Sequence, residues 1–238
     1  MFCDSKTVIN FFSTFALEES EKNYISYHAK RYAEIINIIA DFKQPDCRIL
    51  DIGPAFQTVL IKHFFPEIHI DTLGYHFGKV TYQNKEKHFF FNLNSCQHSN
   101  EWIKTDFSYD IVIFTEVLEH LYVSPTHVLN FIYSLIKTDG ILVLQTPNAV
   151  TLPYRILMLV GRNPFMLLSE NEHIHGHFRE HTMKEMSVYL TKSNFKIVKA
   201  YFKNYFYRNN FLFSIFIISC YFLPPSFRQG MTFIVRKL

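Results

Sequence analysis

Amphipathic segments alternate with short, almost wholly apolar runs from residue 26 to residue 145. The amphipathic segments repeat apolar residues at helical spacing, and the apolar runs have the length of buried strands that end in a turn. A strand–helix–strand rhythm places helices on both faces of parallel strands, so the chain is predicted to form an α/β fold. We expect helices at 26–41, 58–65 and 125–137, and strands at 48–53, 68–73, 89–91, 109–114 and 141–145.

The C-terminal part of the chain continues this plan and adds two apolar insertions. A helix is expected at 182–192, a strand at 195–201 and its antiparallel partner at 231–236. No linker or internal repeat divides the chain, so we expect one domain over 1–238. It would consist of an N-terminal helical cap at 1–45, the sheet and its helices, and apolar insertions at 151–180 and 205–229 that form either a cap or a membrane-contact region.

Composition excludes several classes of protein. A chain that is 48% hydrophobic with a net charge of +3 is not disordered, and its charge argues against broad electrostatic binding of nucleic acid. Its four cysteines include no Cys-x-x-Cys pair, which is typical of reduced thiols in a cytosolic protein. No secretory signal is recognisable. The longest apolar run, 211–223, is too short to span a bilayer. We expect a cytoplasmic protein, with peripheral attachment to the inner membrane as the alternative.

A strand-to-helix turn at Asp51-Ile-Gly53 is the first candidate binding element. Free N–H groups at a helix N-terminus, together with a glycine that allows close approach, suit a nucleotide cofactor, although the same pattern fits an ordinary turn. With 7 glycines in the whole chain, any such loop has to be a reduced version. Three further motifs follow at suitable distances: Phe114-Thr-Glu-Val-Leu-Glu-His-Leu121, Gln145-Thr-Pro-Asn148 and Gly176-His-Phe-Arg-Glu-His-Thr182.

Together these motifs resemble those of class I S-adenosylmethionine-dependent methyltransferases, most closely the bacterial branch with Glu-Val-Leu-Glu-His and Gly-His-Phe-Arg-Glu. The resemblance covers about residues 49–198 and the terminal strand. It implies a Rossmann-like, seven-stranded mixed sheet in the order 3-2-1-4-5-7-6, with strand 7 antiparallel and helices on both faces. It also implies that S-adenosylmethionine binds across the carboxyl ends of strands 1 to 4.

The resemblance assigns cofactor-binding positions one by one. Pro54, Ala55 and Phe56 stand where the family carries further glycines. His76 stands where an acidic residue usually holds the ribose hydroxyls, and Asn92 where an Asp often reads the adenine. An Asn carbonyl can accept that hydrogen bond as well. The implied cofactor-binding set is Asp51, Gly53, Pro54, His76, Asn92, Leu93 and Glu116.

Glu116, Glu119 and His120 share one face if their segment turns helical. In one interpretation Glu116 lines the cofactor cleft and His120 packs in the core. In the other, a similarity to small-RNA 2′-O-methyltransferases and ubiquinone-pathway O-methyltransferases implies a divalent cation (Mg, Mn or Zn) on Glu116, Glu119, His120 and His177. His120 and His177 are also the candidate bases for an acceptor hydroxyl.

We therefore expect a methyltransferase that acts on an oxygen of a small-molecule or lipid-linked acceptor. The alternatives are a metal-assisted RNA-end 2′-O-methyltransferase, against which the modest charge weighs, and a catalytically degenerate binding partner that keeps the fold. The apolar insertions would either pack on each other or contact a membrane surface, with arginines near the headgroups.

Overall fold

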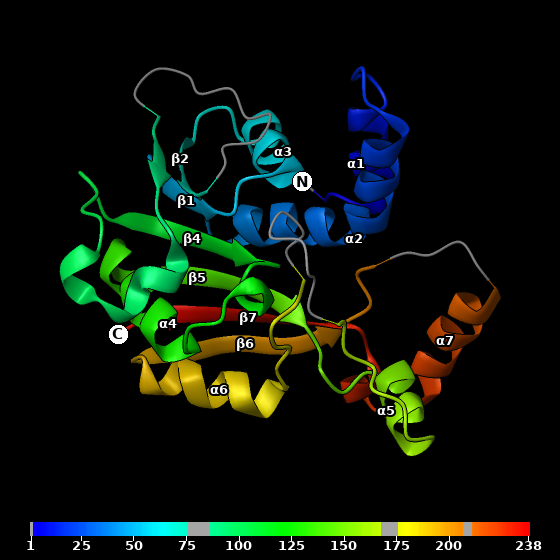
Figure 1. The fold of residues 1–238 in the computed structure, drawn as a ribbon. Coiled ribbons are helices and arrows are strands. Elements are labelled where there is room, and N and C mark those ends of the chain that lie inside the picture. The colour runs from blue at the N-terminus through cyan, green and yellow to red at the C-terminus, as the bar shows by residue number, and fades with distance from the viewer. Residues whose placement is uncertain (1, 76–85, 168–175, 207–210) are drawn as a thin grey trace.

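A single seven-stranded sheet forms the centre of the molecule in the computed structural model, which describes residues 2–75, 86–167, 176–206 and 211–238. The strand order is β3-β2-β1-β4-β5-β7-β6, and β7 is antiparallel to both of its neighbours (Figure 1). The predicted order and the predicted antiparallel strand are confirmed. The strands are β1 (Arg48–Ile52), β2 (His69–Gly74), β3 (His88–Phe90), β4 (Tyr109–Thr115), β5 (Ile136–Pro147), β6 (Phe195–Lys203) and β7 (Gly230–Lys237).

Helices cover both faces of this sheet (Figure 1). On one face lie α1 (Ser5–Phe12), α2 (Glu19–Phe42) and α3 (Phe56–Phe64), and on the other α4 (Pro125–Leu135) and α6 (Met183–Lys192). Short 3₁₀ turns η1 (Leu93–Gln97), η2 (Ser99–Glu101), η3 (Leu118–His120) and η4 (Pro225–Phe227) connect elements, and α5 (Leu152–Leu159) and α7 (Phe211–Phe222) complete the helices of the described residues.

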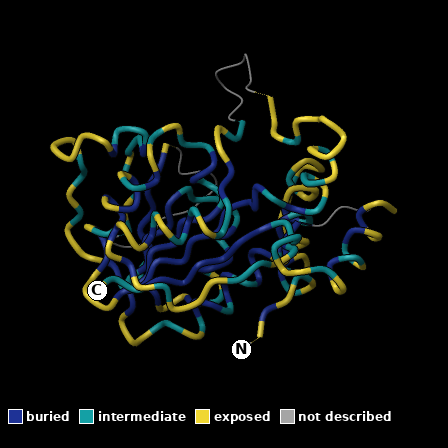
Figure 2. Tube along the Cα trace, turned by 90° about the horizontal axis from the view of Figure 1, so that it is seen from below, coloured by how far each residue is buried: buried dark blue, intermediate teal, exposed yellow. Residues whose placement is uncertain are grey.

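Residues along the central strands alternate between the two cores. Ile49 packs under α2 and α3, whereas the next residue, Leu50, packs under α4. This alternation follows from the two-residue repeat of a strand, and burial on both faces makes the strands continuous apolar runs in the sequence. Figure 2 shows the strands as the most buried part of the chain.

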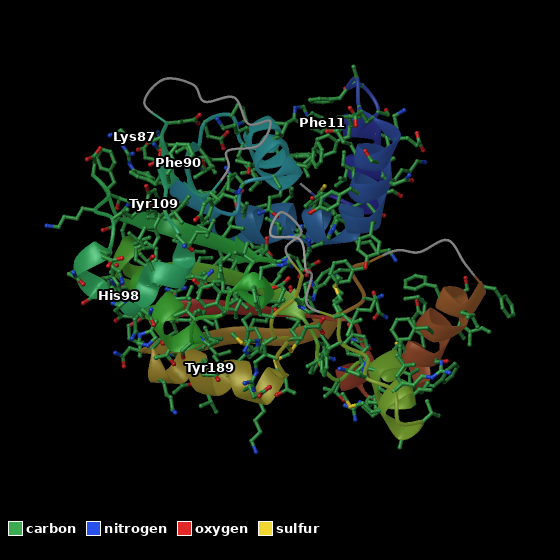
Figure 3. The ribbon with its side chains drawn as sticks, viewed as in Figure 1. Phe11, Lys87, Phe90, His98, Tyr109 and Tyr189 are labelled. Carbon is green, nitrogen blue, oxygen red and sulfur yellow. The ribbon has the colours of Figure 1, made fainter. Side chains whose placement is uncertain are left out.

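The outer helices are fixed by aromatic contacts and caps. Phe11 of α1 stacks on His63 of α3, with ring centroids 4.2 Å apart, at the upper edge of Figure 3. α2 begins at Glu19, earlier than the predicted residue 26, because the backbone N–H of Glu18 donates to the Glu21 carboxylate and caps the helix. The helical content predicted for residues 1–45 is therefore present, and α2 packs directly on the sheet.

Predicted boundaries are also wrong at the junction of α4 and β5. The helix expected to reach residue 137 ends at Leu135, and β5 begins at Ile136 rather than at 141. The chain turns sharply within this segment: Asp139 has a positive φ of 63°, and a Cβ at Gly140 would come within 2.7 Å of the Ile136 side chain. Sequence periodicity cannot separate the end of a buried helix from the start of the strand that follows it without a break.

Helices α5 and α7, which belong to the two apolar insertions, lie beyond the carboxyl ends of the parallel strands (Figure 1), while residues 168–175 and 207–210 of these insertions lie outside the described residues. The two helices contact each other, since Leu152 of α5 packs on Phe213 and Phe216 of α7 in a small separate cluster. Among the described residues, no helix combines the length and the apolar character that crossing a bilayer requires.

Candidate active site

The turn that follows β1 has the geometry of a ligand-binding loop. Gly53 has a φ of 79°, and its N–H donates to the carbonyl of Leu73 at the end of β2 (2.8 Å). A Cβ on Gly53 would come within 2.6 Å of Val117 Cγ2, so no other residue fits without displacement. Phe56, which replaces a family glycine, packs its ring on Phe12 and Tyr24. That aromatic contact turns the large side chain towards α1 and α2.

Beneath this turn lies the fully buried carboxylate of Asp51. It accepts hydrogen bonds from Gln57 Nε2 (2.8 Å) and from Thr58 Oγ1 (2.5 Å) at the start of α3. Burial raises the pKa of Asp51 to about 6, although both hydrogen bonds oppose that rise. Asp51 thus holds the N-terminus of α3 against the end of β1, and the loop between them keeps a fixed shape.

Arg31, which sequence reasoning missed, joins α2 to the same region. Its guanidinium is 2% exposed and donates to Gln57 Oε1 (3.0 Å), Thr115 Oγ1 (2.9 Å) and His28 Nδ1 (3.2 Å). A signal was present in the sequence: Arg31 is spaced three and four residues from His28 and Ile35, on the stripe of α2 that faces the sheet. A charged residue on such a stripe needs buried partners.

Of the other predicted cofactor positions, His76 lies outside the described residues. Asn92 caps η1 by accepting a hydrogen bond from the N–H of Asn94 (3.0 Å), and a second lone pair of its carbonyl remains suited to a ligand. The side chain of Leu93 is buried in the core under α4, which is a packing role. Pro54 lies beside Gly74 at the end of β2.

Glu116 immediately follows β4 and adopts an unusual backbone conformation, with a φ of 55°. Its N–H donates to the carbonyl of Gln145 at the end of β5 (2.9 Å). Burial raises the pKa of its carboxyl to about 7, and the nearby Arg31 opposes that rise. The residue is held at the carboxyl edge of the sheet, where open α/β sheets bind their ligands.

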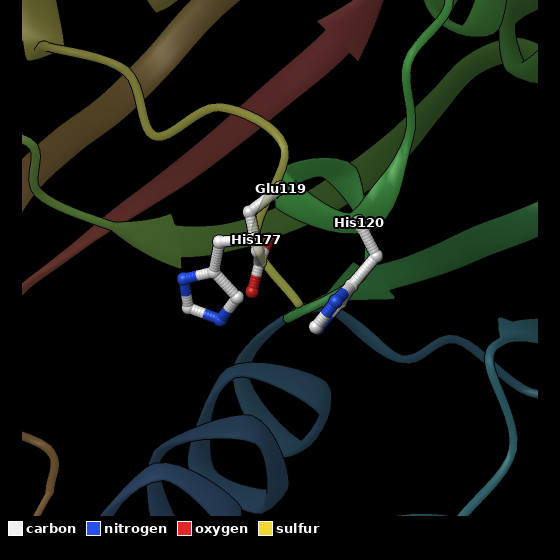
Figure 4. Close-up of side chains that lie close together, drawn as sticks. All are labelled: Glu119, His120 and His177. Atoms are coloured by element: carbon white, nitrogen blue, oxygen red, sulfur yellow. The ribbon is translucent and has the colours of Figure 1, made fainter. Parts of the chain in front are cut away.

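Glu119, His120 and His177 come together although His177 is 57 or 58 positions away from the other two. One potential ligand atom from each lies within 4.8 Å of the others (Figure 4). Glu116 is not part of this group, so the structure assembles three of the four predicted metal ligands. The imidazole rings of His120 and His177 meet edge to face, with centroids 4.9 Å apart.

Backbone hydrogen bonds from η3 hold the segment that carries His177. The carbonyl of Glu119 accepts from the N–H groups of Phe178 (2.7 Å) and Arg179 (3.3 Å), and His120 Nδ1 lies 3.1 Å from the carbonyl of Gly176. The Glu-Val-Leu-Glu-His and Gly-His-Phe-Arg-Glu motifs are therefore two sides of one site.

Glu180 is a second residue of the site that sequence reasoning missed. Its carboxylate contacts His177 Nδ1 (2.8 Å) and accepts from the hydroxyl of Tyr154 on α5 (3.2 Å). The Gly-His-Phe-Arg-Glu motif contained the signal, since Glu180 stands three residues after His177.

Three carboxylates make this region strongly polar inside the protein. Among the described residues, one oxygen each of Glu116, Glu119 and Glu180 is buried without a hydrogen-bond partner. Burial, with the neighbouring Glu116 as a further cause, raises the pKa of Glu119 well above its usual range. Unpartnered buried oxygens beside two imidazoles are a donor set that fits a divalent cation.

A pocket of about 620 Å³ opens next to these residues. Tyr24, Tyr27 and His28 of α2 form one wall, while α5, α7 and the end of β5 form another. Its floor carries the polar groups Glu116, Glu119, His120, His177 and Glu180. A largely apolar cavity with a few convergent polar groups is the usual form of a small-molecule site.

The sheet order with its antiparallel β7, together with a polar site at the carboxyl edge, defines the class I S-adenosylmethionine-dependent methyltransferases. A comparison of the sequence with models of protein families identifies the family. The chain belongs to the family described as "Methyltransferase domain", whose model matches residues 24–200. The chain is thus an S-adenosylmethionine-dependent methyltransferase, and S-adenosylmethionine is the methyl donor that the family implies. No curated protein matches the chain in sequence.

Solved structures share this fold at low identity. A methyltransferase structure from Haloferax volcanii, determined with the Trm112 methyltransferase activator, is 12% identical over 97% of this chain and 98% of that chain, with a TM-score of 0.60. A SAM-dependent methyltransferase from Archaeoglobus fulgidus is 17% identical over 96% and 98%, with a TM-score of 0.55. Another from Methanosarcina mazei is 16% identical over 84% and 97%, with a TM-score of 0.54. These similarities concern the fold and leave the acceptor open.

Proposed function

We propose that this methyltransferase transfers the methyl group to an oxygen of a small-molecule or lipid-linked acceptor. The observation that supports this most strongly is the pair of imidazoles, His120 and His177, on the floor of a pocket at the carboxyl edge of the sheet. An oxygen acceptor has to lose its hydroxyl proton, and an imidazole is the side chain best matched to take it near neutral pH.

Hydrogen bonds set the acid–base character of His177. A carboxylate only accepts, so its contact with Glu180 makes Nδ1 of His177 the donor and Nε2 the proton-accepting nitrogen. The neighbouring His120 is oriented in the same way, because its Nδ1 faces the carbonyl of Gly176. When bound, S-adenosylmethionine supplies a sulfonium methyl group that is already electrophilic. The chain has to align the hydroxyl, take its proton and exclude water.

A mass-spectrometric screen tests this proposal. The purified protein and S-adenosylmethionine are incubated with catechols, phenols, sugars and prenyl-linked phenols, and with matched amines and thiols. Methylated hydroxyl compounds are the expected products. Turnover confined to amines or thiols would overturn the assignment of an oxygen acceptor.

As the alternative to a proton-accepting His177, we propose that Glu119, His120 and His177 bind a divalent cation, in which case His177 Nε2 holds the cation and takes no proton. The short mutual distances of their ligand atoms and the unpartnered Glu119 oxygen support this second function. A cation there would lower the pKa of an acceptor hydroxyl. Glu180 would orient His177 from behind, as carboxylates commonly do for metal-bound histidines.

Metal titration distinguishes a cation-binding role of these residues from a role of the two histidines as bases. Calorimetry with Mn²⁺ or Zn²⁺ on the apoprotein should show one site that Glu119→Gln abolishes, and the control Glu101→Gln on η2 should leave that site intact. If activity survives thorough chelation with EDTA, the cation is not part of the reaction and the imidazoles act alone.

A further inference from the structure

We infer that the exposed apolar side chains of α5 and α7 rest on a bilayer that contains anionic lipid, and that the pocket takes a lipid-linked acceptor from there. This inference rests on the proposed function for the identity of the acceptor. We call these side chains the α5–α7 surface. Its most exposed members, at 59% to 86% exposure, are Leu159, Phe211, Leu212, Ile218, Tyr221 and Phe222.

The composition of α7 is incompatible with a helix that faces water on most sides. Only one side, with Phe213, Phe216 and Cys220, is buried against the rest of the described protein. The other sides carry exposed Phe, Leu, Ile and Tyr, with Ser214 as the exposed exception. A helix with apolar side chains on nearly every side is normally surrounded by core or by lipid.

The length of α7 determines how it meets a membrane. Twelve residues extend about 18 Å, well short of the roughly 30 Å of a hydrocarbon core. The neighbouring α5 has 8 residues and is shorter still. Both helices can therefore lie in the interfacial layer with their exposed apolar side chains immersed, but neither can cross the bilayer.

The charged residues near α5 and α7 favour contact with a membrane that contains anionic lipid. Arg162 directly follows α5 and is exposed, and no aspartate or glutamate occurs between residues 149 and 167. Its long side chain can reach lipid phosphates while its stem remains among apolar groups. Arg155 and Arg228 add positive charge nearby, although Arg155 Nε donates to the carbonyl of Val150 and Arg228 Nη1 to that of Phe202.

The chemistry of the surface favours lipid over a protein partner. A protein interface carries about one hydrogen bond per 100–200 Å². In contrast, five of the seven exposed side chains of α7, at positions 211, 212, 215, 218 and 222, have no hydrogen-bonding group, and Ser214 and Tyr221 are the other two. The interior of a bilayer forms no hydrogen bonds with such side chains. Tyr221, beside Phe222, has an amphipathic ring that suits the boundary between the bilayer and water.

The pocket and this surface are continuous. Leu212 is 76% exposed and also lines the pocket, beside Phe213 and Phe216. On the opposite side, Pro153 and Tyr154 of α5 line it, and the Tyr154 hydroxyl contacts Glu180 of the polar floor. An apolar chain entering the pocket beside Leu212 would thus keep its tail in lipid while its hydroxyl reached the imidazoles.

Flotation with vesicles tests the inference on the full chain. The protein is mixed with phosphatidylcholine vesicles, with or without phosphatidylglycerol, and the bound fraction is measured at low and high salt. We expect binding to the anionic vesicles that weakens in high salt. The triple variant F211S/I218S/F222S, whose positions do not line the pocket, should bind about ten-fold or more weakly, because three apolar side chains no longer leave water.

A matched control carries the same chemistry elsewhere on the surface. Ile9, Val188 and Val198 are exposed on α1, α6 and β6, and the variant I9S/V188S/V198S should keep vesicle binding unchanged. S-adenosylmethionine binding, measured by calorimetry on both triple variants, should match the wild type and shows that each is folded.

Two results would overturn the inference. One is a wild-type protein that binds S-adenosylmethionine but not anionic vesicles. The other is a dimer in light scattering that F211S/I218S/F222S dissociates, which would assign the surface to a second copy of the chain. A protein that binds vesicles but methylates no hydroxyl would instead refute the proposed function and leave the membrane contact standing.

Discussion

The guanidinium of Arg31 donates a hydrogen bond of 2.9 Å to the hydroxyl of Thr115, which joins the N-terminal helix α2 to the end of β4. This contact places a buried cation under the cofactor edge of the sheet. Arg31 lowers the pKa of both Asp51 and Glu116, against the larger opposite effect of burial. The N-terminal helices are therefore part of the site and not an appendage to it.

Replacing Arg31 by Met should lower the free energy of unfolding by about 3–5 kcal/mol, because buried partners lose their donor and buried carboxyls lose their cation. Urea denaturation at neutral pH measures the change. The control Lys30→Met, at an exposed position one residue away, should change stability by less than about 0.5 kcal/mol. Equal effects of the two substitutions would contradict the structural role given to Arg31.

Gly53→Ala should destabilise the protein and weaken S-adenosylmethionine binding. Its positive φ and its close approach to Val117 both oppose a Cβ. Gly161 provides a control, since it has a similar φ of 73° but open space around it, so Gly161→Ala should cost only about 1 kcal/mol. Thermal unfolding and calorimetry would show the difference, and the second substitution Val117→Ala should recover part of the loss caused by Gly53→Ala.

Asp51 should make stability depend on pH with a defined sign. Its pKa rises from 3.8 in the unfolded chain to about 6 on folding, so its stabilising contribution is complete below 3.8 and is lost as the pH rises through 6. At about 1.4 kcal/mol per pKa unit, the loss amounts to roughly 3 kcal/mol. The free energy of unfolding of Asp51→Asn, measured by urea titration, should therefore increase by about this amount relative to wild type as the pH rises from 4 to 7. Parallel pH curves for the two proteins would refute the assigned pKa.

His177→Gln should reduce methyl transfer by about 10²–10⁴-fold if His177 takes the acceptor proton. The dissociation constant for S-adenosylmethionine should stay within about two-fold of wild type, since proton removal belongs to the chemical step. His127→Gln, exposed on α4, is the matched control and should retain full activity. A variant that lost both activity and cofactor binding would show that His177 supports the structure of the cleft instead.

Local patterns in the sequence predicted the strands, and the resemblance to a known family predicted their order in the sheet. The runs at β1, β4 and β5 are buried on both faces, and such strands are visible as continuous apolar segments. The resemblance of their motifs to a known family also predicted that Glu119, His120 and His177 share one site, and their ligand atoms lie close together in the structure. By contrast, Arg31 and Glu180 act through partners far away in the chain or across a loop, and periodicity does not report such contacts.

The role of the apolar insertions could not be predicted from the sequence either. Their segments 152–160 and 211–223 are mostly apolar, so the pattern did not distinguish side chains that pack together from those that face outward. The structure separates Phe213 and Phe216, which pack on Leu152, from Phe211 and Phe222, which are exposed.

Calorimetric titration of the wild-type protein with S-adenosylmethionine tests the central claim most directly, because every catalytic role assigned above requires a cofactor on the Gly53 turn. We expect saturable binding of one molecule per chain, weakened at least about ten-fold by Gly53→Ala and unaffected by Gly161→Ala. If the folded protein shows no heat of binding at millimolar S-adenosylmethionine, the account is contradicted. The chain would then be a methyltransferase fold without methyltransferase activity.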